Sequence, residues 1–393
     1  MDDITGILHS LSSEIEANDA ELASSFYQLE EYYDRKLYHQ LSESLLNIFQ
    51  NPNSAPIRLQ LYDNFISLFA KKVNQLQYVE FLILALNGSG LTPNDSLQYL
   101  TQAKDNINNL FTISQEQDIN DYELIQALLL VDLKLATVKL QCGFVDEASS
   151  IIDQSEKQLD ELICSIESSV MAAFHYAKAQ LMKTHGDFNA FYTNSILFLE
   201  CVDNLDLLEN KDLIIQDICI AGILGDKIYN FGQIINHPIL SCLKLTWLKE
   251  FLVCLNTGNI ETFELLSNHF NEISEISANV EFIKQKVCIM ALIELIFNKP
   301  SNSKVISYKE IEDEISFISN SDEVEHLIMK CLSLNLLKGV LNQVDEEVEI
   351  SWIQPRTMTI EQISTMQKKL ANWTEKTRDV HAYMAKAGEG LYV

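Results

Sequence analysis

The sequence predicts a mainly α protein: a right-handed α-solenoid of TPR-like helix pairs, then a winged-helix module, then a long C-terminal helix. Three observations carry this prediction. The 393 residues include only 12 Gly and 6 Pro, below the average usage of about 7% and about 5%, so long uninterrupted helices are expected. A glycine-centred turn motif repeats along the first three quarters of the chain. Near residue 300 the pattern changes to short helices and strand-like runs.

Residues 1–275 are predicted to form the helical-repeat solenoid. Apolar residues between Leu61 and Val79 recur at helical spacing and predict one helix face. The turn motif then occurs four times, at Gly143, Gly186, Gly225 and Gly258. Each glycine can adopt the left-handed conformation that ends one helix, and an Asp or Asn nearby can begin the next. Its intervals of 43, 39 and 33 residues are typical of an α-solenoid.

Residues 276–355 are predicted to form a winged-helix module, including a linker helix. After the polar, proline-containing segment 298–303, one helix is expected from Ser307 and a second from about Asp322 to Leu336. Two strand-like runs, 337–344 and 348–353, flank a short acidic turn. Two helices followed by a β-hairpin within about 50 residues are typical of a winged helix, a variant of the helix-turn-helix.

The second strand-like run is the candidate partner-binding segment of the wing. Alternation places Val348, Ile350 and Trp352 on one face. We expect that face to pack against the helices of the module, with Trp352 in a structural role. The opposite face, with Glu349, Ser351 and Ile353, is freer to meet a neighbour. If this strand lies at a sheet edge, a partner could add a strand to it. The candidate contact residues are Val348, Glu349, Ile350, Ser351 and Ile353.

Residues 356–393 are predicted to form a C-terminal bundle helix and tail. Apolar residues alternate at spacings of three and four, which is a heptad seam with Thr377 as its polar position. Its large members, all candidate partner-binding residues, are Ile363, Met366, Leu370, Trp373, Val380 and Met384. Little chain remains to cover this seam, so a helix bundle with other proteins is favoured over folding back on the solenoid.

Charge and segment length exclude several classes of partner. The chain carries 28 Lys+Arg against 56 Asp+Glu, a net charge of -28, which phosphate backbones would repel. The second winged-helix helix also begins with acids, Asp322, Glu323 and Glu325. We therefore expect no nucleic-acid partner. No apolar stretch approaches the roughly 18 residues of a membrane span, so no membrane partner is expected. The N-terminus has no secretory signal and the cysteines form no CxxC pair, which favours the cytoplasm and nucleus.

No catalytic, cofactor-binding or metal-binding residue is predicted. The chain has no glycine-rich phosphate loop and no HExxH, and its eight His are scattered; a Cys–His pair distant in sequence stays open. Glu294 is the one charge in the apolar run 287–297. It could be a carboxylate with a raised pKa, but the favoured interpretation is structural. In that interpretation an interhelical ion pair or hydrogen bond fixes how the solenoid meets the winged helix.

Several strings in this architecture resemble the PCI family, named for proteasome, signalosome and initiation-factor subunits. The resemblance is to the PCI subunits of the lid of the 26S proteasome regulatory particle. It covers most of the chain and is strongest from about 215 to 356. The strings that carry it are residues 58–65, 225–232 with 237–239, 324–329, 336–339 and 350–356.

The resemblance implies a non-catalytic scaffold subunit that supports assembly and integrity of the regulatory particle in ubiquitin-dependent protein degradation. It implies a hetero-oligomer in which winged helices of neighbouring PCI subunits lie side by side and C-terminal helices join a bundle with MPN-domain subunits. It also implies proximity to the ubiquitin-receptor subunit with a von Willebrand-type domain. The alternatives are a PCI subunit of the COP9 signalosome or of initiation factor three, or a nucleic-acid-binding PCI protein, which would need a basic stripe on its winged helix.

Overall fold

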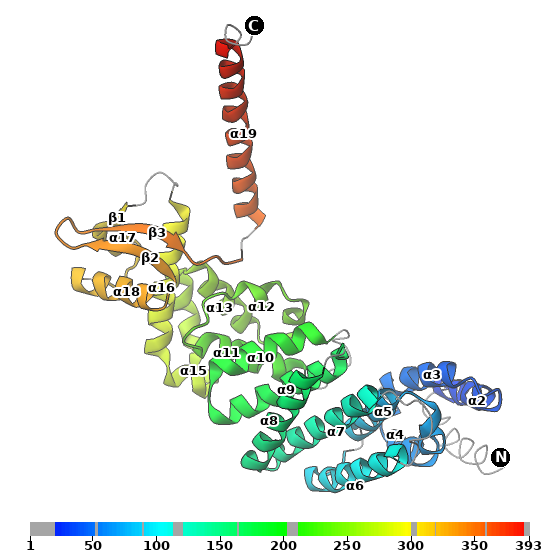
Figure 1. Ribbon diagram of the computed structural model, residues 1–393. Coiled ribbons are helices and arrows are strands. Elements are labelled where there is room, and N and C mark those ends of the chain that lie inside the picture. The colour runs from blue at the N-terminus through cyan, green and yellow to red at the C-terminus, as the bar shows by residue number, and fades with distance from the viewer. Residues whose placement is uncertain are drawn as a thin grey trace. The chain divides into compact units, whose positions relative to one another are not determined.

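The computed structural model describes residues 20–51, 54–88, 90–112, 121–162, 165–202, 211–299, 305–318, 320–357 and 360–388 (Figure 1). The chain divides into two compact units, Met1–Asn210 and Lys211–Val393. Helix pairs lead into a winged helix and then a long helix, so the predicted fold class of α-solenoid plus winged helix is confirmed. The three predicted domains, with limits at residues 275 and 355, stay a prediction.

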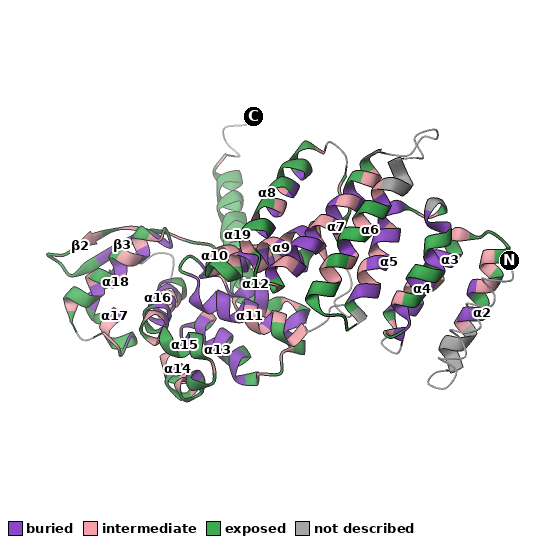
Figure 2. Ribbon diagram, turned by 90° about the horizontal axis from the view of Figure 1, so that it is seen from below, coloured by how far each residue is buried: buried purple, intermediate pink, exposed green. Residues whose placement is uncertain are grey.

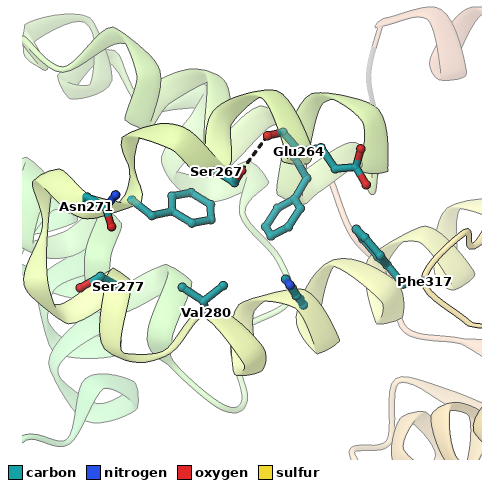
Figure 3. Close-up of a pocket in the computed structure, with 9 residues that line it drawn as sticks. Glu264, Ser267, Asn271, Ser277, Val280 and Phe317 are labelled. Carbon is teal, nitrogen blue, oxygen red and sulfur yellow. Dashed lines mark hydrogen bonds between the residues drawn. The ribbon is translucent and has the colours of Figure 1, made fainter.

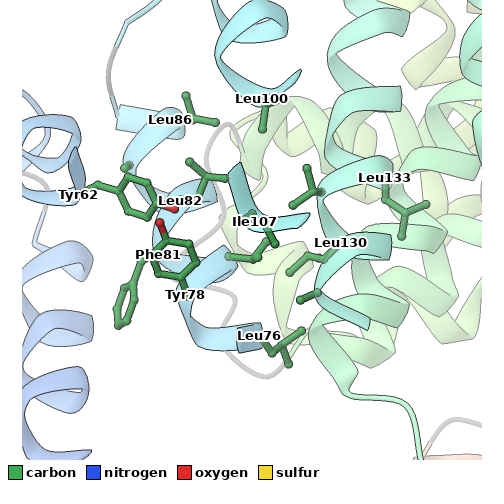
Figure 4. Close-up of a cluster of buried hydrophobic side chains, with 14 of the residues drawn as sticks. Tyr62, Leu76, Tyr78, Phe81, Leu82, Leu86, Leu100, Ile107, Leu130 and Leu133 are labelled. Carbon is green, nitrogen blue, oxygen red and sulfur yellow. The ribbon is translucent and has the colours of Figure 1, made fainter. Parts of the chain in front are cut away.

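The first unit is a stack of helices. Its elements are α2 (Ala20–Asp34), α3 (Tyr38–Gln50), α4 (Arg58–Asn64), η2 (Ile66–Lys72), α5 (Gln75–Gly88), α6 (Pro93–Thr112), α7 (Asp121–Gln141), α8 (Val145–Glu161), α9 (Ser168–His185) and α10 (Phe188–Cys201). Neighbours in sequence pack together, as α2 does on α3, α7 on α8 and α9 on α10. Apolar side chains of α4 to α7 meet in one core, where Phe81, Leu82 and Leu130 are buried (Figure 4).

The helix face predicted between Leu61 and Val79 is divided among three elements, so the expectation of one helix is wrong. Val73 has an extended backbone and separates η2 from α5. The side-chain oxygen of Asn74 then accepts a hydrogen bond from the backbone N–H of Leu76 at 2.9 Å. Such a local bond competes with continued helix. Leu68, one of the apolar residues of the predicted face, lies in η2 and is 56% exposed.

Three of the four glycine turns have the predicted left-handed backbone. They lie between α7 and α8, between α9 and α10, and between α13 (Thr246–Thr257) and α14 (Ile260–Leu266). After the second of these turns, the Asp187 carboxylate accepts from two backbone N–H groups and begins α10. Gly225 is the exception, since its φ is not positive. Its N–H donates to the carbonyl of Ala221 at 2.8 Å, and an irregular loop follows.

The second unit begins with the helices that precede α16 (Val280–Asn298). They are α11 (Lys211–Leu224), α12 (Gly232–Asn236), η4 (Pro238–Cys242), α13, α14, η5 (Ser267–Glu272) and α15 (Ser274–Ala278). Of these, α11, α13 and α14 pack against α16. The second half of α11 and most of α16 are buried (Figure 2). Helix α16 packs against α13 and also against α17 (Tyr308–Glu314) and α18 (Ser321–Ser333). It therefore joins the helical repeats of this unit to the winged helix.

The winged-helix module has one more strand than the sequence predicted. An antiparallel sheet of β1 (Val305–Ser307), β2 (Leu337–Asn342) and β3 (Glu347–Ile353) has the order β1-β3-β2. Strand β1 is only three residues long, so alternation cannot signal it. Ile306, Val348 and Ile350 are buried from the sheet, and Ile311 and Val324 from the two helices.

The last described element is α19 (Ile360–Gly388), a helix of 29 residues. Its described side chains are nearly all exposed, as the green ribbon in Figure 2 shows. Among the helices of the described ranges, none has both the length and the apolarity that a membrane span requires.

Candidate functional site

The seam predicted on the C-terminal helix lies open along α19. Its six large apolar residues are each between 48% and 69% exposed: Ile363, Met366, Leu370, Trp373, Val380 and Met384. At the polar position, the Thr377 hydroxyl donates a hydrogen bond to the backbone carbonyl of Trp373 at 2.8 Å. The hydroxyl therefore has an acceptor within its own helix. A long apolar stripe left in solvent is a feature of protein interaction sites.

Lysines mark one flank of this seam. Lys369 and Lys376 each directly precede a seam position, which places them at the g position of the heptad, and both are exposed. The equivalent positions on the other flank hold Gln367, Thr374 and His381. The asymmetry would suit a partner helix that carries acidic side chains beside its own seam.

Strand β3 is the central strand of the sheet, which corrects the expectation of a free edge. Val348 pairs with Ile306 of β1 and with Leu341 of β2, and Glu349 is likewise paired on both sides. A partner cannot add a strand there. Beyond Glu349, three residues pair with β2 alone among the described strands: Ile350, Trp352 and Ile353. Strand β2 is the last strand in the order β1-β3-β2, so no described strand pairs with its outer edge.

Trp352 is 41% exposed, whereas Ile350 is buried, so the expected core position of Trp352 is wrong. Ile350 pairs with Gly339 but Trp352 pairs with Lys338. Ser351 is therefore an extra residue on β3, a β-bulge. The bulge shifts the alternation by one residue and turns Trp352 outward, where the Lys338 ammonium lies 5.1 Å from the centre of its ring.

Gly339 is the sequence signal that could have revealed this bulge, because glycine inside a strand often marks a bulge or a close approach. A Cβ on Gly339 would lie 2.4 Å from the carbonyl oxygen of Glu349. The predicted outer face is mixed: Glu349 and Ser351 are exposed, and Ile353 is half-buried.

Glu294 forms an ion pair with Arg356 that joins α16 to the segment between the wing and α19. The two side chains are 23% and 11% exposed, and burial lowers the pKa of the Arg356 guanidinium. The same guanidinium donates to the carbonyl of Asn256 at 3.2 Å and lies 5.9 Å from the centre of the Phe297 ring. The sequence predicted an ion pair or hydrogen bond at Glu294 but did not identify Arg356 as its partner.

The next residue, Thr357, packs directly on the start of α12. Its hydroxyl donates to the side-chain oxygen of Asn230 at 3.4 Å. A Cβ added to Gly232 would lie only 1.3 Å from the Thr357 hydroxyl oxygen. We call the segment between β3 and α19 the linker. The surface that holds it is the linker socket, formed by Asn230, Gly232, Asn256, Glu294 and Phe297. Sequence reasoning missed it, because no local pattern connects residues that lie 59 to 127 positions apart.

Lys286 is a second residue that sequence reasoning missed. It is 1% exposed, and its ammonium donates to the carbonyls of Gly222, Ile223 and Gly225 at 2.9, 3.0 and 2.7 Å. Three rings also lie within 6 Å of it: Tyr229, Phe231 and Phe282. Burial lowers its pKa to about 7, and the Asp226 carboxylate opposes that shift. The apolar period of α16, extended back to Phe282, would have placed this lysine on the buried face.

The second unit also contains a cavity of about 330 Å³ between α14, η5 and α16 (Figure 3). Phe263, Phe270 and Phe317 supply its aromatic wall, with Glu264 and Lys284 as charged members. The Ser267 hydroxyl donates to the carbonyl of Glu264 at 2.7 Å. Within the described ranges, no three His, Cys, Asp or Glu side chains gather as a metal site would require.

Comparison with known proteins covers the whole chain. Residues 25–255 match the family model of PSD13 N-terminal repeats, and residues 261–352 match the PCI domain. The chain is 35% identical to the 26S proteasome regulatory subunit RPN9 of Saccharomyces cerevisiae, over 100% of this chain and 99% of that protein. It is 31% identical to the 26S proteasome non-ATPase regulatory subunit 13 homolog B of Arabidopsis thaliana, over 91% and 92%.

A more distant similarity is to a subunit of a different complex. The chain is 25% identical to the COP9 signalosome complex subunit 7 of Dictyostelium discoideum, but over only 39% of this chain and 56% of that protein.

Proposed function

Because this chain belongs to the PCI-domain family of 26S proteasome regulatory subunits that includes RPN9 and non-ATPase subunit 13, we propose that it is a non-catalytic scaffold subunit of the proteasome lid. The observation that carries the proposal is 35% identity to RPN9 over the full length of both chains. The sequence strings noted above resemble that same subunit, number nine of the non-ATPase set. In this role the chain supports assembly and integrity of the regulatory particle in ubiquitin-dependent protein degradation.

Two surfaces would carry the scaffold role. The seam of α19 would enter a helical bundle with other lid subunits, including those with MPN domains. Its exposure supports this role, because a solvent-facing stripe that includes Leu370 and Trp373 is unfavourable in a free chain. The outer face and the β2 edge of the wing would meet a neighbouring PCI subunit. Val340, 68% exposed on β2, supports this contact. The ubiquitin-receptor subunit with a von Willebrand-type domain is a further expected neighbour.

The proposal assigns no catalysis to this chain. The relative in Arabidopsis is named as a non-ATPase regulatory subunit, and the two surfaces act through contact alone. As part of the proteasome lid, the chain would work in the cytoplasm and nucleus.

Purification of the tagged full-length chain at native abundance, followed by mass spectrometry of its companions, tests this function. We expect lid and ATPase-ring subunits in near-equal amounts. Recovery of COP9 signalosome subunits in their place would favour the signalosome alternative, for which the partial similarity to subunit 7 is the supporting observation. Recovery of initiation-factor subunits or of RNA would likewise contradict the proposal.

A further inference from the structure

The linker socket is built more elaborately than a simple connection between two domains requires. Arg356 places a charge next to Glu294, donates to a backbone carbonyl and lies over an aromatic ring. Thr357 fills the space that a side chain at position 232 would occupy. Two consecutive linker residues are thus held by residues that lie 59 to 127 positions earlier in the chain.

The socket also reaches the first turn of α19. The side-chain amide of Gln362 donates to a carboxylate oxygen of Glu294 at 3.5 Å. Glu294 therefore contacts both the linker and the helix that follows it. Only two residues separate Thr357 from Ile360, the first residue of α19. Contacts with α12, α13 and α16 therefore hold Arg356 and Thr357 before α19 and Gln362 in its first turn.

The length of α19 makes this attachment consequential. At a rise of 1.5 Å per residue, 29 residues extend about 43 Å, so a tilt of roughly 20° at the linker would move the far end by roughly 15 Å. A helix that swings freely is in the binding-competent direction only part of the time, and its apparent affinity falls by that fraction.

We propose that Gly232, Glu294, Arg356 and Thr357 are positioning residues that hold the linker in its socket and so aim the exposed seam of α19 at its partner helices. The inference rests on the proposed bundle role of α19 and goes beyond it. The socket makes no contact with the partner, and its contribution is to limit the directions that the helix samples before docking.

Two pairs of variants test the socket, each with its own rescue. Gly232→Ala places a methyl group where the Thr357 side chain lies, and Thr357→Gly removes every side-chain atom that it would meet. The φ of Gly232 lies outside the left-handed range, so alanine causes no backbone strain of that kind there. Arg356→Glu breaks the ion pair, and adding Glu294→Arg restores it with the charges exchanged. Lys299→Glu, which breaks the exposed Lys299–Glu310 pair of the same unit, is the matched control.

Two measurements are made on the full-length chain: hydrogen exchange of the backbone amides from 354 to 363, and the rate of incorporation into lid that lacks this subunit. We expect both single variants to speed exchange. If the anchored fraction falls to about a tenth, incorporation should weaken about tenfold. Both double variants should recover most of the loss, and Lys299→Glu should change neither measurement.

The inference is overturned if the single variants leave exchange unchanged, or if exchange rises while incorporation keeps its normal rate. A chain truncated after Thr357 separates this outcome from failure of the proposed function. If that truncated chain enters the lid as well as the intact one, the bundle role of α19 is wrong. If it fails to enter while Gly232→Ala and Arg356→Glu enter normally, only the positioning role is wrong.

Discussion

Lys286 is a charged residue inside an apolar core, and its partners explain how the fold accommodates it. Its three carbonyl acceptors lie at and just beyond the C-terminal end of α11, where backbone carbonyls lack intrahelical donors. The positive charge also complements the negative end of the helix dipole. Lys286 therefore ties α16 to α11 and replaces the cap that Gly225, with its ordinary φ, does not provide.

Lys286→Met should lower the free energy of unfolding by about 1–3 kcal/mol at pH 7, because buried carbonyls lose their donor. The difference in unfolding free energy between the unmodified chain and the variant should be larger at pH 9. The folded-state pKa, about 7, lies below the ordinary 10.5, so between these values the unfolded chain binds more protons and stability rises with pH. The Lys286→Met variant lacks this titrating group, so only the unmodified chain gains unfolding free energy in this way. Urea unfolding at both pH values measures it.

The control for this prediction is Lys284→Met, on an exposed part of the same helix. It should leave the urea midpoint nearly unchanged at both pH values. A gap between Lys286→Met and the unmodified chain that stays constant from pH 7 to pH 9 would contradict the titration argument.

Gly258 and Gly186 provide a matched pair for measuring a close backbone approach. Both have a positive φ, of 68° and 76°, and both end a helix. A Cβ at Gly258 would lie 2.5 Å from the backbone nitrogen of Ala291, whereas a Cβ at Gly186 would meet nothing within 4 Å. Gly186→Ala should therefore cost only the conformational strain, about 1–2 kcal/mol.

Gly258→Ala should cost clearly more, because α13 must also move away from α16. Thermal unfolding of the two variants compares them, with hydrogen exchange of α13 and α16 to locate the damage. Equal losses in the two variants would mean that the helices adjust to the methyl group and that the close approach contributes little.

At the scale of elements, the sequence patterns correctly predicted the features that depend on residues close together along the chain. The turns at residues 143, 186 and 258, the buried run of α16 and the seam of α19 all follow from local periodicity. The features that the sequence patterns missed depend on contacts between residues far apart in the sequence. Strand β1 exists through pairing with β3, the bulge at Ser351 changes the face of Trp352, and the linker socket assembles from three separate segments, at α12, α13 and α16.

The lysine flank of α19 gives a prediction for the partner. Changing Lys369 and Lys376 together to Glu should slow entry into the lid by about tenfold or more, because like charges would face an acidic flank on the partner helix. The effect should shrink as ionic strength rises, since exposed charges are screened beyond about 10 Å at 0.1 M salt. Competition between tagged variant and intact chain for lid, at two salt concentrations, measures it.

The control carries the same change in charge away from the seam. Lys368 and Arg378 are exposed on the remaining surface of α19, and changing both to Glu should have little effect on entry. If the two double variants behave alike, net charge matters and the position of the lysines beside the seam does not.

At the scale of the whole molecule, charge is distributed unevenly along the chain. From Pro355 onward there are 6 Lys+Arg and 4 Asp+Glu, while the preceding residues hold 22 and 52. The acidic part repels other acidic surfaces and phosphate backbones. The C-terminal segment that contains α19 is the exception, so in the proposed bundle its electrostatics would favour acidic partners that the rest of the chain would repel.

Removal of α19 by truncation after Thr357 should therefore separate folding from assembly. This end point keeps Arg356, so Glu294 is not left as an unpaired, half-buried charge. Since the seam is exposed, its loss should uncover little apolar surface, and the thermal midpoint should change by only a few degrees. Retention in purified lid should be lost. A large fall in the midpoint would instead mean that α19 folds back on its own chain in solution, the arrangement that the sequence left as its alternative.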